Sequence, residues 1–273
     1  MKHFLTLLVT LTTLFFNTAA QQLNLTKGQL IETTLQSDQT MDLGSGMEMK
    51  SDVSSAYTLT VADIISDSLY QVFASFASIK ATAVGMGQNQ EYDSETGEGK
   101  DTELGKAFHD KIGRMDTVIL NKLTARLVVE NDGMAANPIT ALQNQTLELG
   151  SVIENLFFIL PPGKNAKDKW LVKSDLNGID SDTEYELLSL SENIAAVNFK
   201  TGVNGTSKME MEGMTVNVTT NGTISGTLKV DVTTGVIQQK VLDSDLKSSM
   251  ELMGQTMEMS VKGKTTVTNT LRR

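Results

Sequence analysis

Polar and apolar residues alternate along most of the chain, and the alternating runs are rich in Thr and Val. A period of two is the spacing of a strand with one buried face, so these runs predict β-strands. Three Asn-Gly pairs, at 177–178, 204–205 and 221–222, separate such runs, and Asn-Gly favours a tight hairpin turn. We therefore expect an antiparallel meander with one buried and one solvated face. Its predicted strands are 184–190, 194–203, 207–219, 223–232, 236–246 and 256–271.

The first half of the chain shows the same alternation with longer connections between the runs. Two segments depart from it and predict helices. The first starts at Asp101 or Thr102 as N-cap and ends at Gly113; the second starts at Asn137 and is stopped by Pro161 and Pro162. The sequence thus predicts a mainly β (α+β) protein, with two or three helices covering part of an antiparallel sheet. The predicted strands of this half are 29–36, 47–59, 69–84, 117–122 and 124–130.

The first 20 residues are typical of a cleaved secretory signal. Lys2 and His3 form a basic start, residues 4–16 an apolar stretch, and residues 18–20 a small-residue cleavage site. The alternative is a retained anchor, but the apolar stretch is shorter than the roughly 20 residues that span a bilayer. We expect an exported product, periplasmic or extracellular, whose mature chain has no transmembrane segment.

A polar stretch at 163–169 is the best candidate for a boundary between two parts of the mature chain. It divides the chain into an N-terminal β-rich half with two helices, residues 21–162, and a C-terminal antiparallel meander, residues 163–273. Because both halves have the same alternating pattern, we expect them to form one continuous domain.

Charge and composition narrow the possible functions. The chain has 33 acidic and 23 basic residues, a net charge of −10, two histidines and no cysteine. The negative charge argues against binding nucleic acid. Thiolate, zinc-ribbon and iron–sulfur chemistry needs cysteine, and the acidic turn at 175–184 does not fit the calcium loop of an EF-hand. No motif of a nucleophilic or phosphate-binding enzyme is present. We expect no catalytic residues, no metal, no cofactor and no enzymatic activity.

The most distinctive pattern is methionine alternating with charge, which places each methionine pair on one face of a strand. We weigh three interpretations: adaptable core filler, which we prefer; an apolar groove for a hydrophobic ligand; and a Cu(I) site, which would usually add His or Cys. We expect Gly213 to mark a β-bulge within the strand 207–219. Trp170 is a core anchor or, alternatively, a ligand-stacking residue. The candidate ligand-binding residues are Met47, Met49, Met209, Met211, Met214, Met257, Met259 and Trp170.

Three short motifs carry a family resemblance. They are D-S-x-x-G at 93–97, a strand opening at Lys167 to Trp170, and D-x-x-T-G at 231–235. With the leader, they resemble uncharacterised exported bacterial proteins grouped under a domain of unknown function. That family is similar in architecture to LolA-type lipoprotein carriers. The resemblance implies a strongly curved antiparallel sheet or half-barrel with two or three helices packed on it, and no catalytic residues.

Two functions fit these observations. The first is a cell-envelope or periplasmic binding module whose apolar groove holds a lipid or hydrophobic peptide. The second is a structural or protein-interaction component of the envelope without a small-molecule site. The partner is accordingly a hydrophobic ligand or an envelope protein.

Overall fold

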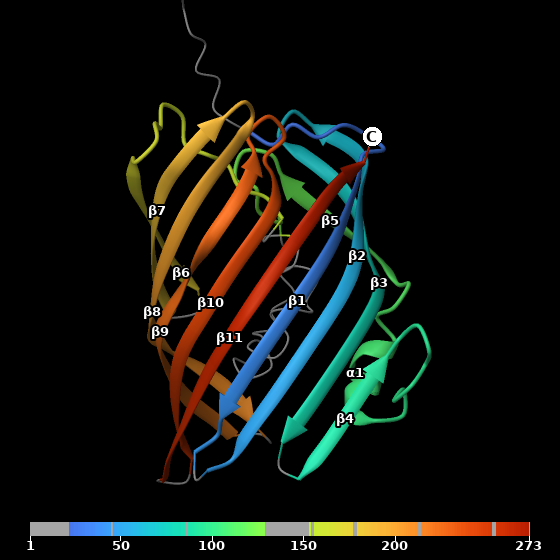
Figure 1. Ribbon diagram of the computed structural model, residues 1–273, viewed down its shortest axis with the longest axis vertical. Helices are drawn as coiled ribbons and strands as arrows, with labels where there is room; N and C mark the ends of the chain where they lie inside the picture. Colours follow the sequence, from blue (N-terminus) through green and yellow to red (C-terminus); the bar gives the residue numbers. More distant parts are fainter. Residues whose placement is uncertain are drawn as a thin grey trace, which may run out of the picture.

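The alternating runs of the sequence form the strands of a single large sheet. The computed structural model describes residues 22–44, 46–85, 87–128, 153, 156–176, 179–211, 214–252 and 255–272. Within them the sheet has 11 strands in the order β4-β3-β2-β1-β11-β10-β9-β8-β7-β6, and β5 also pairs with β3 (Figure 1). The strands are β1 (Leu30–Asp42), β2 (Glu48–Ser66), β3 (Leu69–Gly85), β4 (Gln88–Asp93), β5 (Met115–Asn121), β6 (Lys169–Leu176), β7 (Ile179–Ser191), β8 (Ile194–Met211), β9 (Met214–Asp231), β10 (Val236–Leu252) and β11 (Gln255–Arg272).

Neighbouring strands are antiparallel, and most are joined by hairpins. The exception is the pairing of β1 with β11, which runs from Leu30 opposite Arg272 to Asp42 opposite Ser260. This pairing joins an N-terminal meander to a C-terminal one. Within the described residues the sheet is not closed: β6 pairs only with β7, and β4 and β5 pair only with β3.

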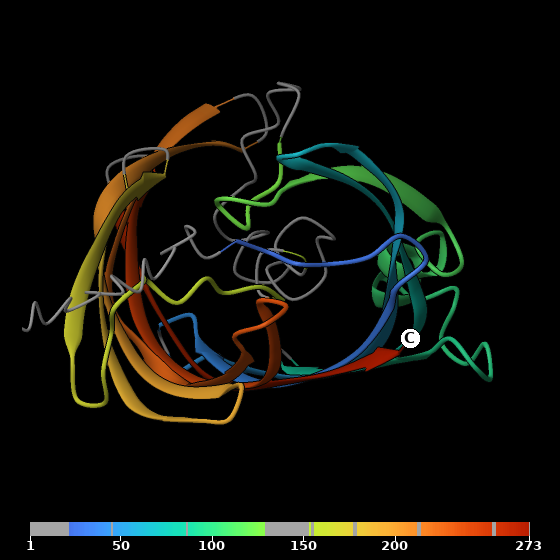
Figure 2. The ribbon, with the colours of Figure 1, turned by 90° about the horizontal axis from the view of Figure 1, so that it is seen from above.

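Each long strand buries alternate side chains on one face. Seen from above, the sheet bends round so that one face is concave (Figure 2). On β1 the side chains of Ile31 and Leu35 are buried while Glu32 is not, and β11 follows the same rule with Val261 and Val267 buried. We call this buried face the inner face. It carries one core cluster over β1, β2, β3 and β5 and another over β7 to β10.

Segments outside the sheet help to fill both clusters. Leu23 and Leu25 belong to the first, together with Leu156 and Phe157, and Leu160 belongs to the second. The two clusters therefore lie against the same sheet, and the segment 156–160 contributes side chains to both. No helix in the described ranges is long and apolar enough to cross a membrane.

The predicted fold class was wrong in its helices. The described part of the chain is mostly antiparallel sheet and contains one short helix, α1 (Glu103–His109), rather than two or three packed on the sheet. The second predicted helix lies largely outside the described residues. Its predicted end is extended instead, because its backbone pairs with the start of β10: the amide of Phe158 donates to the carbonyl of Gly235, and that of Ile237 donates to the carbonyl of Leu156.

Two of the three predicted Asn-Gly turns are also wrong. Asn204 and Asn221 lie opposite each other in the middle of β8 and β9. The strands continue through them because the alternation of inward and outward positions is not interrupted there. The chain instead reverses between Met211 and Met214, so the strand predicted at 207–219 is two strands and not one with a bulge. Residues 177–178, 212–213 and the leader lie outside the described residues.

Candidate functional site

The methionine-rich segments meet at one end of the sheet. Met41 lies opposite Met49 across β1 and β2, and Met250 lies opposite Met257 across β10 and β11. Across β8 and β9, Met211 pairs with Met214 and Met209 with Val216. All three hairpins reverse at the same edge of the molecule, the lower end in Figure 1. We call this region, residues 41–49, 207–220 and 248–261, the methionine end.

The described methionines of this end belong to the inner face. Met41, Met250 and Met259 are buried, with 6%, 4% and 8% of their surfaces exposed. Met49 is half-buried. Met47 and Met257 are the accessible members, with 40% and 39% of their surfaces exposed. The side chains of Met209, Met211 and Met214 lie outside what the structure describes.

Four side chains form a separate buried cluster at this end, with Leu43 packed against it. The four are Val216, Val218, Met250 and Met259, contributed by β9, β10 and β11. Thioethers are flexible and polarizable, so a surface of Met and Val can adapt to apolar groups of different shapes. The cluster thus offers an apolar, deformable surface at one end of the inner face.

Buried hydroxyl groups lie among these apolar side chains. Ser207 on β8 is buried and lies opposite Val218 in the register of β8 and β9. Thr220 and Ser248, from β9 and β10, are also buried, and their hydroxyl oxygens are 2.9 Å apart. The methionine end therefore combines thioether and methyl groups with hydroxyls.

Trp170 is not part of this end. It stacks on Tyr185, with ring centroids 5.4 Å apart, and lies in the core cluster over β7 to β10. When the strand pairing is followed from Trp170 across the sheet, the residues that lie level with it include Phe199 on β8 and Leu242 on β10. Met250 is eight residues further along that strand, which corresponds to about 26 Å at roughly 3.3 Å per residue. The structure thus brings the methionine segments together and leaves Trp170 in a separate aromatic cluster.

A lysine lies beside that aromatic cluster. The ammonium nitrogen of Lys240 is 5.4 Å from the centroid of the Phe199 ring. Burial lowers the pKa of Lys240 to about 8, because the charged form is poorly solvated there. Lys240 therefore loses its proton at a lower pH than a solvated lysine does.

Outside the first 20 residues the sequence has one histidine, and its environment is structural. Nδ1 of His109, at the end of α1, lies 3.2 Å from the hydroxyl oxygen of Tyr92 on β4. The two rings are also edge-to-face, with centroids 6.3 Å apart. This pair attaches the helix to the edge of the sheet.

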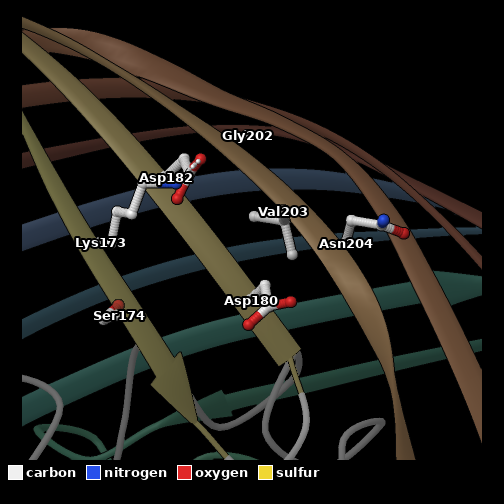
Figure 3. A pocket seen from close by; sticks show the side chains of 7 residues that line it. All are labelled: Lys173, Ser174, Asp180, Asp182, Gly202, Val203 and Asn204. Carbon is white, nitrogen blue, oxygen red and sulfur yellow. Dashed lines mark hydrogen bonds and ion pairs between the residues drawn. The ribbon is translucent and has the colours of Figure 1, made fainter.

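A polar hollow that the sequence did not predict lies over β6, β7 and β8 (Figure 3). Its volume is about 590 Å³, and an ion pair between Lys173 and Asp182, 3.1 Å long, crosses its wall. No local sequence motif marks it, because its lining side chains come together only once β6, β7 and β8 have paired side by side. Across the described ranges, no three acidic or histidine side chains are grouped so as to hold a metal. The hollow is lined by Lys173, Ser174, Asp180, Asp182, Gly202, Val203 and Asn204.

A second hollow, of about 430 Å³, lies at the methionine end. Its lining includes Ser248 and Met259 from the row described above, and most of its other residues are polar or charged. Ser248 and Met259 are buried on the inner face, whereas lining residues next to them in sequence, such as Lys247 and Glu258, are exposed on the other face. This hollow therefore lies mainly on the outer side of the sheet, apart from the buried apolar cluster. The remaining lining residues are Asp42, Gly44, Asn221, Lys247, Ser249, Glu258 and Ser260.

Comparison with known proteins gives one family match. A family model described as a family of unknown function (DUF6263) matches residues 119–237, from β5 to the start of β10. This match supports an uncharacterised domain, as the resemblance implied, whereas the LolA-type architecture finds no support. No curated protein matches the chain.

Comparison with solved structures gives matches at low sequence identity. A structure of lipovitellin that addresses lipid–protein interactions matches with a TM-score of 0.50 and 9% identity, covering 91% of this chain and 26% of that chain. This chain therefore spans about a quarter of that lipovitellin chain. The translocator domain of the autotransporter NalP from Neisseria meningitidis matches with a TM-score of 0.26 and 9% identity, over 90% of this chain and 89% of that one. OpdQ from Pseudomonas aeruginosa matches with a TM-score of 0.26 and 3% identity, over 91% and 100%. At such identities, the lipovitellin match shows a similar fold and nothing about activity.

Proposed function

We propose that the protein is an exported, non-enzymatic binding module of the cell envelope that holds a lipid or hydrophobic peptide at its methionine end. The observation that carries this proposal is the gathering of methionines from the β1–β2 and β10–β11 hairpins at one end of the inner face, next to Val216 and Val218 of β9. Met250 and Met259 form a buried apolar surface there, and Met47 and Met257 are exposed beside it. An exposed thioether next to a buried apolar cluster gives an apolar ligand a continuous surface to contact.

Two further facts support a lipid as the ligand. The lipovitellin structure with a similar fold is one that addresses lipid–protein interactions. The leader predicts export, which would place the protein among membrane lipids and lipoproteins of an envelope. Charge supports a neutral or apolar ligand, because the net charge of −10 disfavours anionic surfaces.

The test is native mass spectrometry of the mature protein purified from its own envelope fraction, followed by organic extraction. We expect a co-purifying lipid or peptide, and we expect Met257→Glu to lose it because a charge enters the accessible part of the apolar surface. The matched control is Met115→Glu, since Met115 is 64% exposed on β5, outside the methionine end. A ligand retained by Met257→Glu, or lost equally from both variants, would contradict the proposed site.

The second candidate is an envelope interaction protein without a small ligand. Its support is the edge of the sheet at β6, which pairs only with β7 within the described residues. Leu171 and Val172 are exposed on β6, and Leu188 and Leu190 are exposed on β7. Exposed large apolar side chains beside an open edge favour contact with another protein. A mass without any ligand under gentle conditions would favour this second function over the first.

A further inference from the structure

The hydroxyl groups at the methionine end have hydrogen-bonding capacity that the protein does not use. Ser207 is 6% exposed, and its hydroxyl has no hydrogen-bond partner among the residues that the structure describes. A buried hydroxyl without a partner is costly, because it has lost the hydrogen bonds of water and gained none. Ser207 lies on the inner face opposite Val218, a member of the buried cluster, so its unused donor belongs to the same surface as the methionines.

The pair formed by Thr220 and Ser248 leaves a second donor. Their hydroxyls are 2.9 Å apart, and either can be the donor. Each hydroxyl can donate one hydrogen bond. One of the two donates to the other, and the O–H of the second hydroxyl finds no acceptor within the pair. Ser248 lies opposite Met259, and Thr220 is two residues from Val218, so this donor also lies at the apolar cluster.

The charges of the same strands are placed elsewhere. At and beside the methionine end, the charged residues of β10 and β11 alternate with the buried ones, and they are exposed to solvent. The buried surface therefore offers hydroxyl donors and apolar groups, and it offers no described charge to neutralise a carboxylate or a phosphate. These exposed residues are Asp245, Lys247, Glu251, Glu258 and Lys262.

A ligand complementary to this surface has apolar chains and uncharged acceptors without donors. A carboxylate or phosphate would lose hydration without gaining a countercharge, whereas a plain hydrocarbon would leave the hydroxyls without partners. An ester carbonyl at the start of an acyl chain meets both demands. We infer that the methionine end binds the ester-linked acyl chains of an uncharged lipid, and that Ser207 and the Thr220–Ser248 pair donate hydrogen bonds to its carbonyl oxygens. This inference rests on the proposed function.

The test compares two lipids that differ only in the carbonyl groups. Delipidated mature protein is incubated with neutral vesicles that carry a radiolabelled diacylglycerol or the diether glycerol with the same chains. The protein is then separated by gel filtration and the bound label is counted. We expect the diester to bind about tenfold more tightly than the diether, because the diether cannot accept these hydrogen bonds. Ser207→Ala and Ser248→Ala should each reduce that preference to about twofold or threefold, through weaker diester binding with diether binding unchanged.

Ser55→Ala is the matched control. Ser55 is likewise buried without a hydrogen-bond partner, but it lies opposite Leu35 and Ile79, away from the methionine end. It should leave the preference unchanged. Equal binding of diester and diether, or a preference that survives Ser207→Ala and Ser248→Ala, would overturn the inference while leaving the proposed function standing. Binding of neither lipid would count against the proposed function itself. A preference lost equally in Ser55→Ala would show that the effect is not local, which also overturns the inference.

Discussion

Gly226 and Gly202 show how the packing of one position depends on the strands beside it. Both glycines lie within long strands, Gly226 on β9 and Gly202 on β8. A Cβ atom on Gly226 would overlap the carbonyl oxygen of Val241 and lie 2.9 Å from the Cα of Leu242, whereas a Cβ on Gly202 would meet nothing within 4 Å. Both contacts at Gly226 are with backbone atoms of β10, which cannot move aside as a side chain could.

We therefore predict opposite outcomes for the two alanine variants. Gly226→Ala should lower the free energy of unfolding by about 1–3 kcal/mol, the typical cost of forcing extra atoms into a packed site. Gly202→Ala should change it by less than about 0.5 kcal/mol, as for surface substitutions. Urea unfolding followed by circular dichroism measures both. Equal losses would mean that glycine is needed at these positions for another reason than the approach of β10.

At the scale of elements, α1 illustrates both the strength and the limit of local sequence signals. The capping pattern predicted a helix here and left Asp101 and Thr102 as alternative N-caps. The structure selects Thr102, whose hydroxyl accepts a hydrogen bond from the amide of Gly105 at 3.0 Å and donates one to the carbonyl of Gly99 at 2.6 Å. The helix has only seven residues, because the chain must then return to the sheet at β5.

Thr102→Ala should therefore destabilise the helix locally, by about 1 kcal/mol, because it removes an N-cap side chain. Hydrogen exchange of the amides in residues 103–109 measures this loss, and exchange within β1 and β11 should not change. Asp101→Ala is the control and should leave the same amides protected. Faster exchange in the Asp101 variant alone would mean that the cap is assigned to the wrong residue.

The strands were predictable where only the alternation mattered, and not where the chain had to turn. Alternation predicted strands at 69–84 and 236–246, close to β3 and to the first part of β10. It could not show that Asn204 and Asn221 pair with each other inside a sheet, because a turn-forming dipeptide is overruled when both neighbouring strands continue. The end of the second predicted helix failed for a similar reason: its amides are bonded to β10, a partner distant in sequence.

At the scale of the whole molecule, the candidate site depends on topology. The sequence showed three methionine patterns separately, and period two placed each on one face of a strand. Their convergence requires β1 to pair with β11, which brings residues 41–49 beside residues 257–261. No local pattern carries that information. The same holds for the unpaired hydroxyl of Ser207, which is recognisable only once its surroundings are known.

The β1–β11 pairing also gives a prediction for the two halves of the chain. Expressed separately as residues 21–162 and 163–273, each half should lack cooperative thermal unfolding, because each would expose one long edge and part of the shared core. Co-expressed, the two fragments should associate and copurify. The cut lies at Gly163, which is exposed, so it removes no core contact. A sharp transition in either isolated half would show that the halves are independent domains.

The pairing of β1 with β11 also affects the order in which the sheet can form during synthesis. A chain that emerges from the ribosome with its N-terminus first makes β1 and β2 early, yet the other neighbour of β1 is β11, which is made after the other described strands of the sheet. Such a long-range partner makes folding slow and late. A sheet that stays incomplete until β11 has been made is compatible with threading of the unfolded chain across a membrane, which the export predicted from the leader would need.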